Sequence, residues 1–507
     1  MTARPNLLFI QTDQLTIDVL SFYGNPIAQT PTLDRLAATG TVFETAYCNF
    51  PLCAPSRMSM ATGLLASKVG AYDNATEFPA TIPSYAHYLR KMGYRTCLSG
   101  KMHFVGPDQL HGFERRTTTD IYPGDFAWTP DWSSTGFHGA TDTRVLTDSG
   151  VCRRNVQIDY DEDVTHKAVQ EIFDAARASD ERPFFLHVSY THPHDPYLCQ
   201  QQHWDLYGEV DIPMPRVGMI PHNENDPHSL RVLQQHGFAD ANVPDEAIAR
   251  ARRAYCGSVS YIDDQVARLL AALEESGQAE NTIIIFTSDH GEMLGERGLW
   301  LKKTFFEPAL RVPLIIAAPS NFADGLVAGG RLSTPVSLLD LLPSFTAIAH
   351  GGEWHDAVDD LDGDSLLNIA KQPEHDRPIY AELLSEGILA PIFMIRRDGF
   401  KLITSKGDPD LLYDLTADAD EQNNLAKDPA HQERLMALKQ EADAKWDSDD
   451  LVQKIVLSQK RRRLVLDAHA IGIPPSWDFD TGAEDDARYY RGDGNYNDWA
   501  MDYLPKK

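Results

Sequence analysis

Apolar runs of strand length alternate with segments of helical periodicity through most of this chain. Such alternation is typical of an α/β fold with a mostly parallel sheet. Glycine follows each of three predicted helices at or just beyond its end, as expected for residues that terminate helices. The predicted strands are Asn6–Thr12, Tyr94–Leu98, Pro183–Thr191, Thr282–Ser288 and Val312–Ala317, and the predicted helices are Thr32–Thr39, Pro83–Met92 and Asp245–Ser276.

Polar residues follow four of these strands close to the point where each strand ends. Ligands in open α/β sheets bind beyond the carboxyl ends of the strands. We therefore expect these polar residues to meet at one rim of the sheet. They are Asp13 after the first strand, Lys101 and His103 after the second, His194 after the third, and Asp289 and His290 after the fourth.

Near residues 373–378 the pattern changes to short strands separated by turn signals such as Asp398-Gly399. This pattern predicts a small antiparallel sheet followed by a helix of about Pro429–Lys445. The predicted strands of this sheet are Ile379–Glu382, Ile392–Arg396, Phe400–Thr404 and Leu411–Tyr413.

The last part of the chain combines a basic helix containing Lys460–Arg463 with a tail rich in Pro, Gly, Asp and Tyr. The tail has more aromatic residues than typical disordered segments, so we expect it to pack on its own subunit or on a neighbour. A disordered end is the alternative. The expected domains are a catalytic domain at 1–375, a smaller α+β subdomain at 376–445, and a helix with an aromatic tail, at an oligomer interface, at 446–507.

Length and charge narrow the class of protein. A chain of 507 residues exceeds the roughly 250–300 residues at which a single core stops growing. Its net charge of −28 argues against nucleic acid and against an anionic membrane surface as partners. The apolar stretch Leu7–Ile10 is too short for a signal-peptide core, and no segment approaches the roughly 18 apolar residues of a membrane span. The six cysteines lack paired spacing, so we expect a cytoplasmic, reducing location without disulfides or a zinc cluster.

The most informative short motif surrounds Cys53, which is followed by Pro55 at +2 and Arg57 at +4. This spacing is the pattern recognised for conversion of cysteine to formylglycine. The alternative is an ordinary buried thiol at a helix start, where Pro55 suits the first turn. A formylglycine hydrate carries two hydroxyls on one carbon. One hydroxyl attacks the sulfur of a sulfate ester, and loss of the proton of the other expels the sulfate.

This chemistry calls for a divalent cation and for positive charge around the sulfate. Asp13, Asp289 and His290 are the candidate metal ligands, together with an oxygen of the modified Cys53. Oxygen-rich ligation suits Ca²⁺, Mg²⁺ or Mn²⁺, and the one imidazole leans slightly away from Ca²⁺. Ca²⁺ is the expected ion, with Mn²⁺ or Mg²⁺ as alternatives. One of the cationic groups is expected to protonate the leaving alcohol oxygen. The candidates near the sulfate are Arg57, Lys101, His103, His194 and Lys302.

The chain resembles the type I, formylglycine-dependent sulfatases of the alkaline phosphatase superfamily, and more specifically their choline-sulfatase branch. The resemblance implies a sandwich with a large mixed, mostly parallel sheet flanked by helices, plus a smaller C-terminal α+β subdomain with an antiparallel sheet. It implies Asp13, Cys53, Asp289 and His290 as metal ligands, with Asn74 joining the cationic residues around the sulfate. The similar stretches are Cys53–Arg57, Tyr72–Ala75, Ser99–His103, Pro107–Glu114, Thr119–Pro123, Thr191–Tyr197, Ser288–Gly291 and Gly295–Trp300.

The same resemblance implies two kinds of partner protein. One is a formylglycine-generating enzyme, which acts during maturation. The other is a second copy of this chain, in a homodimer or homotetramer whose C-terminal tail helps to close a neighbour's site.

The resemblance also suggests a subsite for a trimethylammonium headgroup. Trp128 and Glu386 match the positions of the aromatic ring and the carboxylate in this branch, although core packing is the alternative role for Trp128. The segment 132–150 departs from the branch, because it places Arg144 near the aligned position and offers only His138 in place of the usual histidine. An arginine beside the headgroup would repel choline. The tail offers Asp493 or Asp498 as the carboxylate that a neighbour would contribute.

Choline-O-sulfate, a small-molecule sulfate ester, is the expected substrate. The alternatives that use the same site are a broader arylsulfatase and a phosphonate monoester or phosphodiester hydrolase. A catalytically silent binding protein is a further alternative, and the joint presence of metal ligands and cations argues against it.

Overall fold

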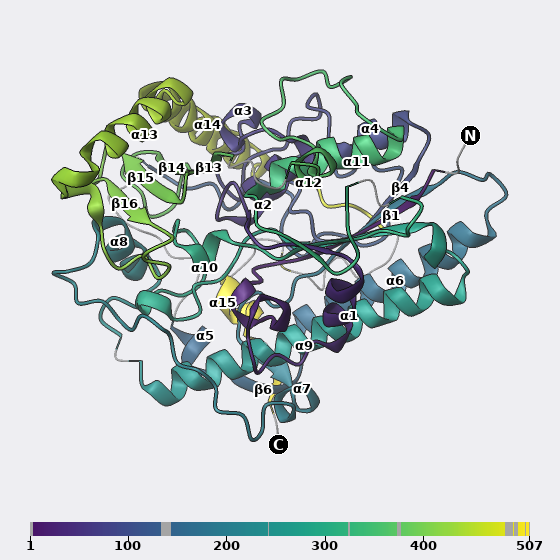
Figure 1. The fold of residues 1–507 in the computed structure, drawn as a ribbon, viewed down its shortest axis with the longest axis horizontal. Helices are drawn as coiled ribbons and strands as arrows, with labels where there is room; N and C mark the ends of the chain where they lie inside the picture. The colour runs from purple at the N-terminus through teal and green to yellow at the C-terminus, as the bar shows by residue number, and fades with distance from the viewer. Residues whose placement is uncertain are drawn as a thin grey trace.

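The structure is a computed structural model that describes residues 4–132, 143–241, 243–322, 325–372, 377–481, 490, 495–501 and 503–505. An eight-stranded sheet with the strand order β11-β2-β10-β9-β1-β7-β4-β5 forms its centre (Figure 1). The bounds of the strands are β1 Asn6–Thr12, β2 Thr41–Phe43, β3 Ala46–Tyr47, β4 Arg95–Gly100, β5 Arg115–Arg116, β6 Gly150–Asn155, β7 Phe184–Ser189, β8 Leu198–Gln200, β9 Thr282–Ser288, β10 Leu314–Ala317, β11 Gly330–Leu332, β12 Val336–Ser337, β13 Ile379–Leu383, β14 Ile392–Arg397, β15 Phe400–Ser405, β16 Leu411–Asp414 and β17 Tyr503–Pro505.

The middle of the sheet is parallel and buried. β1 pairs in parallel with both β7 and β9, and β4 pairs in parallel with β7. All seven residues of β1 are buried, because helices cover both faces of the sheet. β10 runs antiparallel to β9, so the sheet is mixed and mostly parallel, as the sequence predicts.

Helices form a layer on each side of this sheet (Figure 1). α6 and α9 pack against each other on one side, while α2, α4 and α11 lie on the other. Every α-helix that the sequence predicts is present within a few residues of its predicted bounds. The helices are α1 Pro31–Thr39, α2 Cys53–Thr62, α3 Ala66–Val69, α4 Tyr85–Lys91, α5 Arg144–Thr147, α6 Val156–Arg177, α7 Gln201–Asp205, α8 Pro227–Gln235, α9 Asp245–Glu275, α10 Glu307–Leu310, α11 Leu341–His350, α12 Leu366–Ala370, α13 Gln432–Lys445, α14 Ser448–His469 and α15 Tyr496–Ala500.

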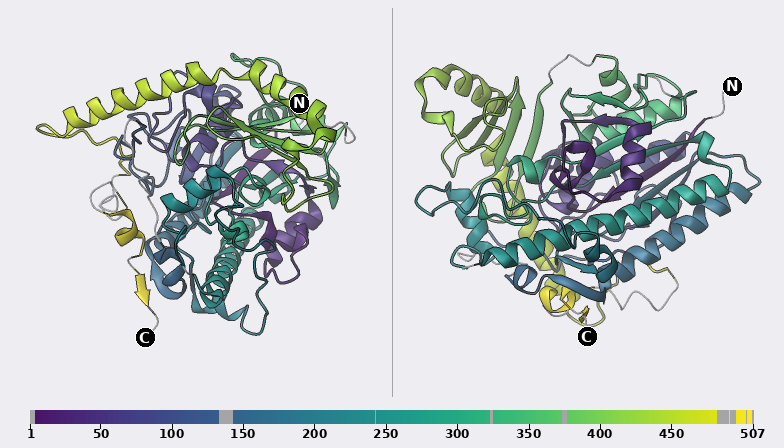
Figure 2. Two further views of the ribbon diagram at one scale, coloured as in Figure 1. Left: turned by 90° about the vertical axis from the view of Figure 1, so that its left-hand side faces the viewer. Right: turned by 60° about the horizontal axis from the view of Figure 1, so that its bottom comes forward.

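The C-terminal part forms the predicted antiparallel sheet, in the order β13-β14-β15-β16, with α13 packed against it. The basic helix of the sequence is α14, which runs along the outside of the molecule (Figure 2). The described part of the tail returns to its own chain, where β17 pairs with β6. The expected domain boundary between residues 375 and 376 lies within 373–376, which is outside the described residues.

Across the part of the chain that the structure describes, no helix combines the length and the apolar character needed to cross a membrane. All six cysteines are buried and free.

Candidate active site

Cys53 is the first residue of α2 and is 1% exposed. The helix N-terminus places partial positive charge beside its side chain, which favours a negatively charged group there. Leu52, the residue before the helix, provides no side-chain cap. Instead, Asn74 accepts a hydrogen bond from the backbone N–H of Ala54 at 3.0 Å. Asn74 therefore helps to hold the start of the helix that carries Cys53.

Four buried side chains converge at the carboxyl ends of β1 and β9. Asp13, Cys53, Asp289 and His290 each offer a ligand atom, and these atoms all lie within 4.8 Å of one another. Cys53 Sγ is 3.3 Å from His290 Nε2 and 3.9 Å from Asp13 Oδ1. His290 Nδ1 lies 3.0 Å from the carbonyl oxygen of Gly291, to which it donates, so Nε2 presents a lone pair to the cluster. Two carboxylates and one imidazole nitrogen in a closed space fit a divalent cation.

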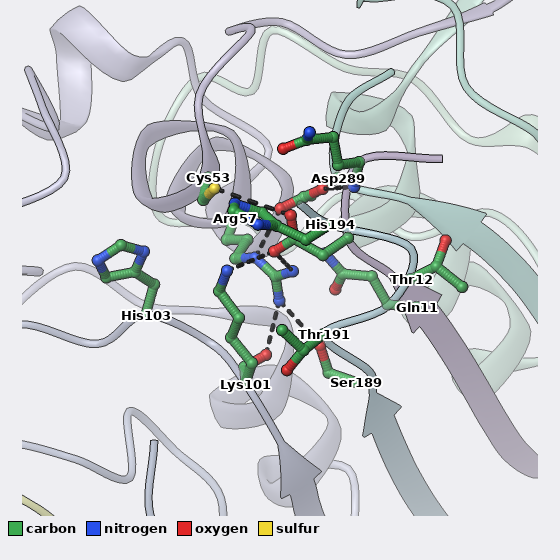
Figure 3. Close-up of polar contacts among 12 residues, drawn as sticks. Gln11, Thr12, Cys53, Arg57, Lys101, His103, Ser189, Thr191, His194 and Asp289 are labelled. Atoms are coloured by element: carbon green, nitrogen blue, oxygen red, sulfur yellow. Dashed lines mark hydrogen bonds and ion pairs between the residues drawn. The ribbon is translucent and has the colours of Figure 1, made fainter. Parts of the chain in front are cut away.

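Arg57 holds the two carboxylates in place (Figure 3). Its Nη2 donates to Asp13 Oδ2 at 2.9 Å, and its Nε donates to Asp289 Oδ2 at 2.8 Å. Its Nη1 donates to the Lys101 carbonyl at 2.6 Å and to Ser189 Oγ at 2.8 Å. Every donor nitrogen of this fully buried guanidinium is therefore used by the protein. Arg57 therefore organises the two carboxylates, and its place beside the sulfate stays a prediction.

Lys101 adds a second positive charge on Asp13, because its Nζ also contacts Asp13 Oδ2. Burial and the charge of Cys53 raise the pKa of Asp13, but the positive charges of Lys101 and Arg57 outweigh them and hold it well below its usual range. Burial raises the pKa of Asp289 despite the opposing charge of Arg57. The two carboxylates thus differ in basicity, although both contact one arginine.

The electrostatic field at position 53 favours an anion. Burial opposes ionisation of Cys53, yet the positive charges of Lys101 and Lys302 lower its pKa well below the usual value for a thiol. The same surroundings would stabilise an oxyanion at this position.

Lys302 and His194 form a hydrogen-bonded pair that lines the same cavity as Cys53. His194 Nδ1 is 2.8 Å from the Asp195 carbonyl, to which it donates, so its Nε2 accepts from Lys302 Nζ at 2.8 Å. Burial favours the neutral form of Lys302, but the charges of Cys53, Asp195 and Asp13 raise its pKa above the ordinary value. Lys302 is therefore a protonated donor in the same cavity as Cys53.

His103 lies to one side of the carboxylate cluster (Figure 3). Its ring centroid is 5.1 Å from that of Tyr122 and 5.6 Å from that of Trp128. Its backbone N–H donates to Asp120 Oδ2 at 2.7 Å, and its φ of 57° is unusual for a residue with a side chain. His103 therefore lies between the polar cluster and the aromatic wall beside it.

A cavity of about 710 Å³ opens above Cys53. Trp128 and Glu386 both line it, and so does Asn74. Residues of the described tail, among them Tyr496, close part of its rim, and the hydroxyls of Tyr496 and Tyr122 are 3.2 Å apart. Within a single chain, the tail thus covers that chain's own site.

Comparison with known proteins identifies the family. The sulfatase family model matches residues 5–351, which is more than half of the chain. The chain belongs to the sulfatase family. It is a sulfuric ester hydrolase. Two further family models match its C-terminal part. The model of the N-sulphoglucosamine sulphohydrolase C-terminal region matches residues 295–447, and the model of the choline sulfatase C terminus matches residues 453–502.

Individual relatives agree with this membership. A choline-sulfatase of Rhizobium meliloti is 40% identical over 506 residues, covering 97% of each chain. An arylsulfatase of Clostridium perfringens is 29% identical over 460 residues, covering 85% of this chain and 92% of the relative. A phosphonate monoester hydrolase from Silicibacter pomeroyi shares the fold, with a TM-score of 0.71, 24% identity, and coverage of 87% of this chain and 95% of that one.

One residue of this sulfatase site was missed by the sequence reasoning. Gln14 has a φ of 65°, and its backbone N–H donates to Asp289 Oδ1 at 3.1 Å. Its side chain joins the Lys302 ammonium to the buried carboxylate of Glu292. The only signal in the sequence was its position directly after Asp13, at the end of a strand.

Of the two departures in segment 132–150, Arg144 is the one within the described residues, whereas Trp132 of the same segment lines the cavity. Arg144 donates to Asp498 at 3.0 Å, and neither residue is among the described residues that line the cavity. Arg144 is therefore not in direct contact with the cavity in which a headgroup would bind, so the expected repulsion of choline is not supported by a contact. His138 and Asp493 lie outside the described residues.

Proposed function

We propose that this sulfatase hydrolyses choline-O-sulfate to choline and sulfate, using formylglycine made from Cys53. The main support for this substrate is that Trp128 and Glu386 line the same cavity as Cys53. An aromatic face and a carboxylate are the groups that recognise a quaternary ammonium. The full-length similarity to a choline-sulfatase supports this choice.

The proposed reaction proceeds in two displacements at position 53. One hydroxyl of the formylglycine hydrate loses its proton and attacks sulfur, the bond between sulfur and the choline oxygen breaks, and that oxygen takes up a proton. The sulfate is then an ester of residue 53. Loss of the proton from the remaining hydroxyl re-forms the aldehyde and expels sulfate, and water restores the hydrate.

The side chains divide this work by position. The pair formed by Lys302 and His194 supplies the proton to the leaving oxygen, because Lys302 is protonated and close to the nucleophile. Lys101 offsets negative charge beside Asp13. A divalent cation held by Asp13, Asp289, His290 and the oxygen of residue 53 would acidify the attacking hydroxyl and offset charge on the sulfate; Ca²⁺ is the expected ion, with Mn²⁺ or Mg²⁺ as alternatives.

Maturation of the proposed nucleophile requires a formylglycine-generating enzyme as a partner. Cys53 is 1% exposed, and every residue of α2 is buried. Since a modifying enzyme must reach the thiol, we infer that modification precedes completion of folding.

The test combines mass spectrometry with kinetics on protein made with and without a formylglycine-generating enzyme. The peptide containing residue 53 is expected to be lighter than its cysteine form, because one oxygen replaces a sulfur and two hydrogens. Turnover of choline-O-sulfate should rise in proportion to the modified fraction. Full activity with an intact thiol would disprove the nucleophile, and faster turnover of an aryl phosphonate than of any sulfate ester would disprove the substrate class.

We further infer that the chain assembles with copies of itself, as a homodimer or a homotetramer. Leu457, Leu464 and Ile471 follow one another at intervals of seven along α14 and just beyond it, and are 48%, 71% and 81% exposed. Arg461 and Asp467, both exposed, stand three residues on either side of Leu464. In an antiparallel pair of α14 helices centred on Leu464, each arginine would face the partner's aspartate, which supports a two-fold interface.

A further inference from the structure

A lysine lies directly beside the carboxylate of the proposed headgroup subsite. Lys303 Nζ forms an ion pair with Glu386 Oε2, and both residues line the cavity above Cys53. The side chain of Lys303 is 5% exposed, whereas that of Glu386 is 19% exposed. The carboxylate thus faces the cavity more openly than the ammonium that neutralises it.

Separate contacts hold the backbones of these two residues. The backbone N–H of Lys303 donates to the Pro51 carbonyl at 3.2 Å, two residues before Cys53. Next to Glu386, the carbonyl of Gly387 accepts from Arg231 Nε at 3.0 Å, and Arg231 is itself paired with Asp408. Arg231 therefore holds the backbone next to Glu386 through a contact that does not involve Lys303.

We propose that Lys303 is a specificity-determining residue that weakens the preference of this site for cationic leaving groups. This inference rests on the proposed sulfate ester hydrolysis. An ammonium next to Glu386 offsets the attraction that the carboxylate exerts on a positively charged headgroup, and it also repels that headgroup directly. The site therefore accepts cationic esters while retaining neutral ones, whereas an unpaired glutamate would favour cations more strongly.

The competing explanation is that Lys303 only positions Glu386, and the two explanations predict opposite results. If Lys303 competes with the headgroup, K303M raises the ratio of kcat/KM for choline-O-sulfate to kcat/KM for the neutral ester 4-nitrophenyl sulfate, by about tenfold or more. If Lys303 positions the carboxylate, the same variant lowers that ratio. E386Q lowers the ratio under either explanation. The double variant K303M/E386Q, which restores the net charge of the pair, should return within about threefold of the wild-type ratio.

The matched control is K439M, which breaks the Lys439–Asp410 ion pair between α13 and the segment before β16. A K439M ratio equal to that of the wild type attributes the K303M change to the cavity and not to the loss of a lysine. K303Q serves as a second variant if K303M is less stable. An unchanged or lowered ratio in both variants would overturn the proposal.

Choline binding separates this inference from the proposed function. Isothermal titration calorimetry of choline with wild type and K303M compares headgroup affinity without turnover. Tighter binding of choline to K303M than to wild type supports charge competition, whether or not the esters are hydrolysed. Failure of the wild-type enzyme to hydrolyse either ester would reject the proposed function and leave this inference standing. Equal or weaker binding to K303M overturns the role of Lys303 whatever the activity.

Discussion

At the scale of single residues, the active site of this sulfatase is organised by one arginine. Arg57 contacts both Asp13 and Asp289, which come from different strands, and it lies on the same helix as Cys53. Its positive charge permits two buried carboxylates to lie close together, which without compensation would be strongly unfavourable. The residue that the sequence places near the sulfate thus links the proposed nucleophile to the candidate metal ligands.

Replacement of Asp289 tests the metal site at this scale. D289N keeps the shape of the side chain and removes its charge, so we expect metal content to fall and kcat/KM for sulfate esters to drop at least about 100-fold. Metal analysis of the purified protein and steady-state kinetics with added Ca²⁺ measure the two effects. D356N, which changes an exposed aspartate, is the control. Wild-type metal content together with wild-type kinetics in D289N would remove Asp289 from the site.

At the scale of elements, a buried lysine connects the small C-terminal sheet to the loop that follows Lys302. Lys401, on β15, donates to the Phe305 carbonyl at 2.8 Å, three residues after Lys302. Its Nζ is also 2.6 Å from Glu307 Oε1 and 2.8 Å from Glu421 Oε1. Burial raises the pKa of Glu421 despite the nearby charge of Lys401. Since the three charges depend on one another, β15 and the loop after Lys302 form one unit.

The variant K401M measures the strength of this connection. It leaves two carboxylates facing each other without their shared cation, so we expect the free energy of unfolding to fall by about 3–5 kcal/mol. Urea unfolding followed by fluorescence provides the measurement. Loss of the surface pair of Lys439 in K439M should cost about 1 kcal/mol or less. An equal effect in the two variants would show that burial of Lys401 does not matter.

At the scale of the whole molecule, the chain leaves one apolar stripe uncovered while closing its own cavity. The stripe consists of Leu457 and Leu464 on α14 and of Ile471 just beyond it. The residues that close the cavity belong to the segment after that helix, including Tyr496. An assembly through α14 would therefore place the interface next in sequence to the segment that covers the site.

Charge swaps on α14 test this assembly. In the antiparallel pairing, R461D places one aspartate opposite Asp467 of the other copy in each of the two symmetric contacts. Like charges then meet, and the oligomer should dissociate at least tenfold more readily, by about 1.4 kcal/mol or more. The double variant R461D/D467R restores opposite charges and should restore the assembly. Sedimentation equilibrium gives the dissociation constants. V358E, at a 79% exposed position elsewhere, is the control, and unchanged assembly in R461D would contradict the pairing.

The sequence alone determined those features that depend on short-range patterns. Periodicity predicted the central strands and the long helix α9, because neighbouring residues reveal which side of an element is buried. Spacing marked Cys53, and the position of Asp13 and Asp289 at strand ends predicted their meeting, because parallel strands bring their carboxyl ends to one edge. The helix α6 was not predicted, although it covers the sheet together with α9.

Only the tertiary structure decided which distant side chains pair. The contacts of Arg57 with Asp289, of Lys303 with Glu386 and of Tyr496 with Tyr122 join residues far apart in the sequence. Such pairs depend on how loops pack once the sheet has formed, and no local periodicity encodes them. The sequence therefore determined the candidate nucleophile and the edge of the sheet at which the candidate metal ligands meet. Packing decided which charges surround the leaving group.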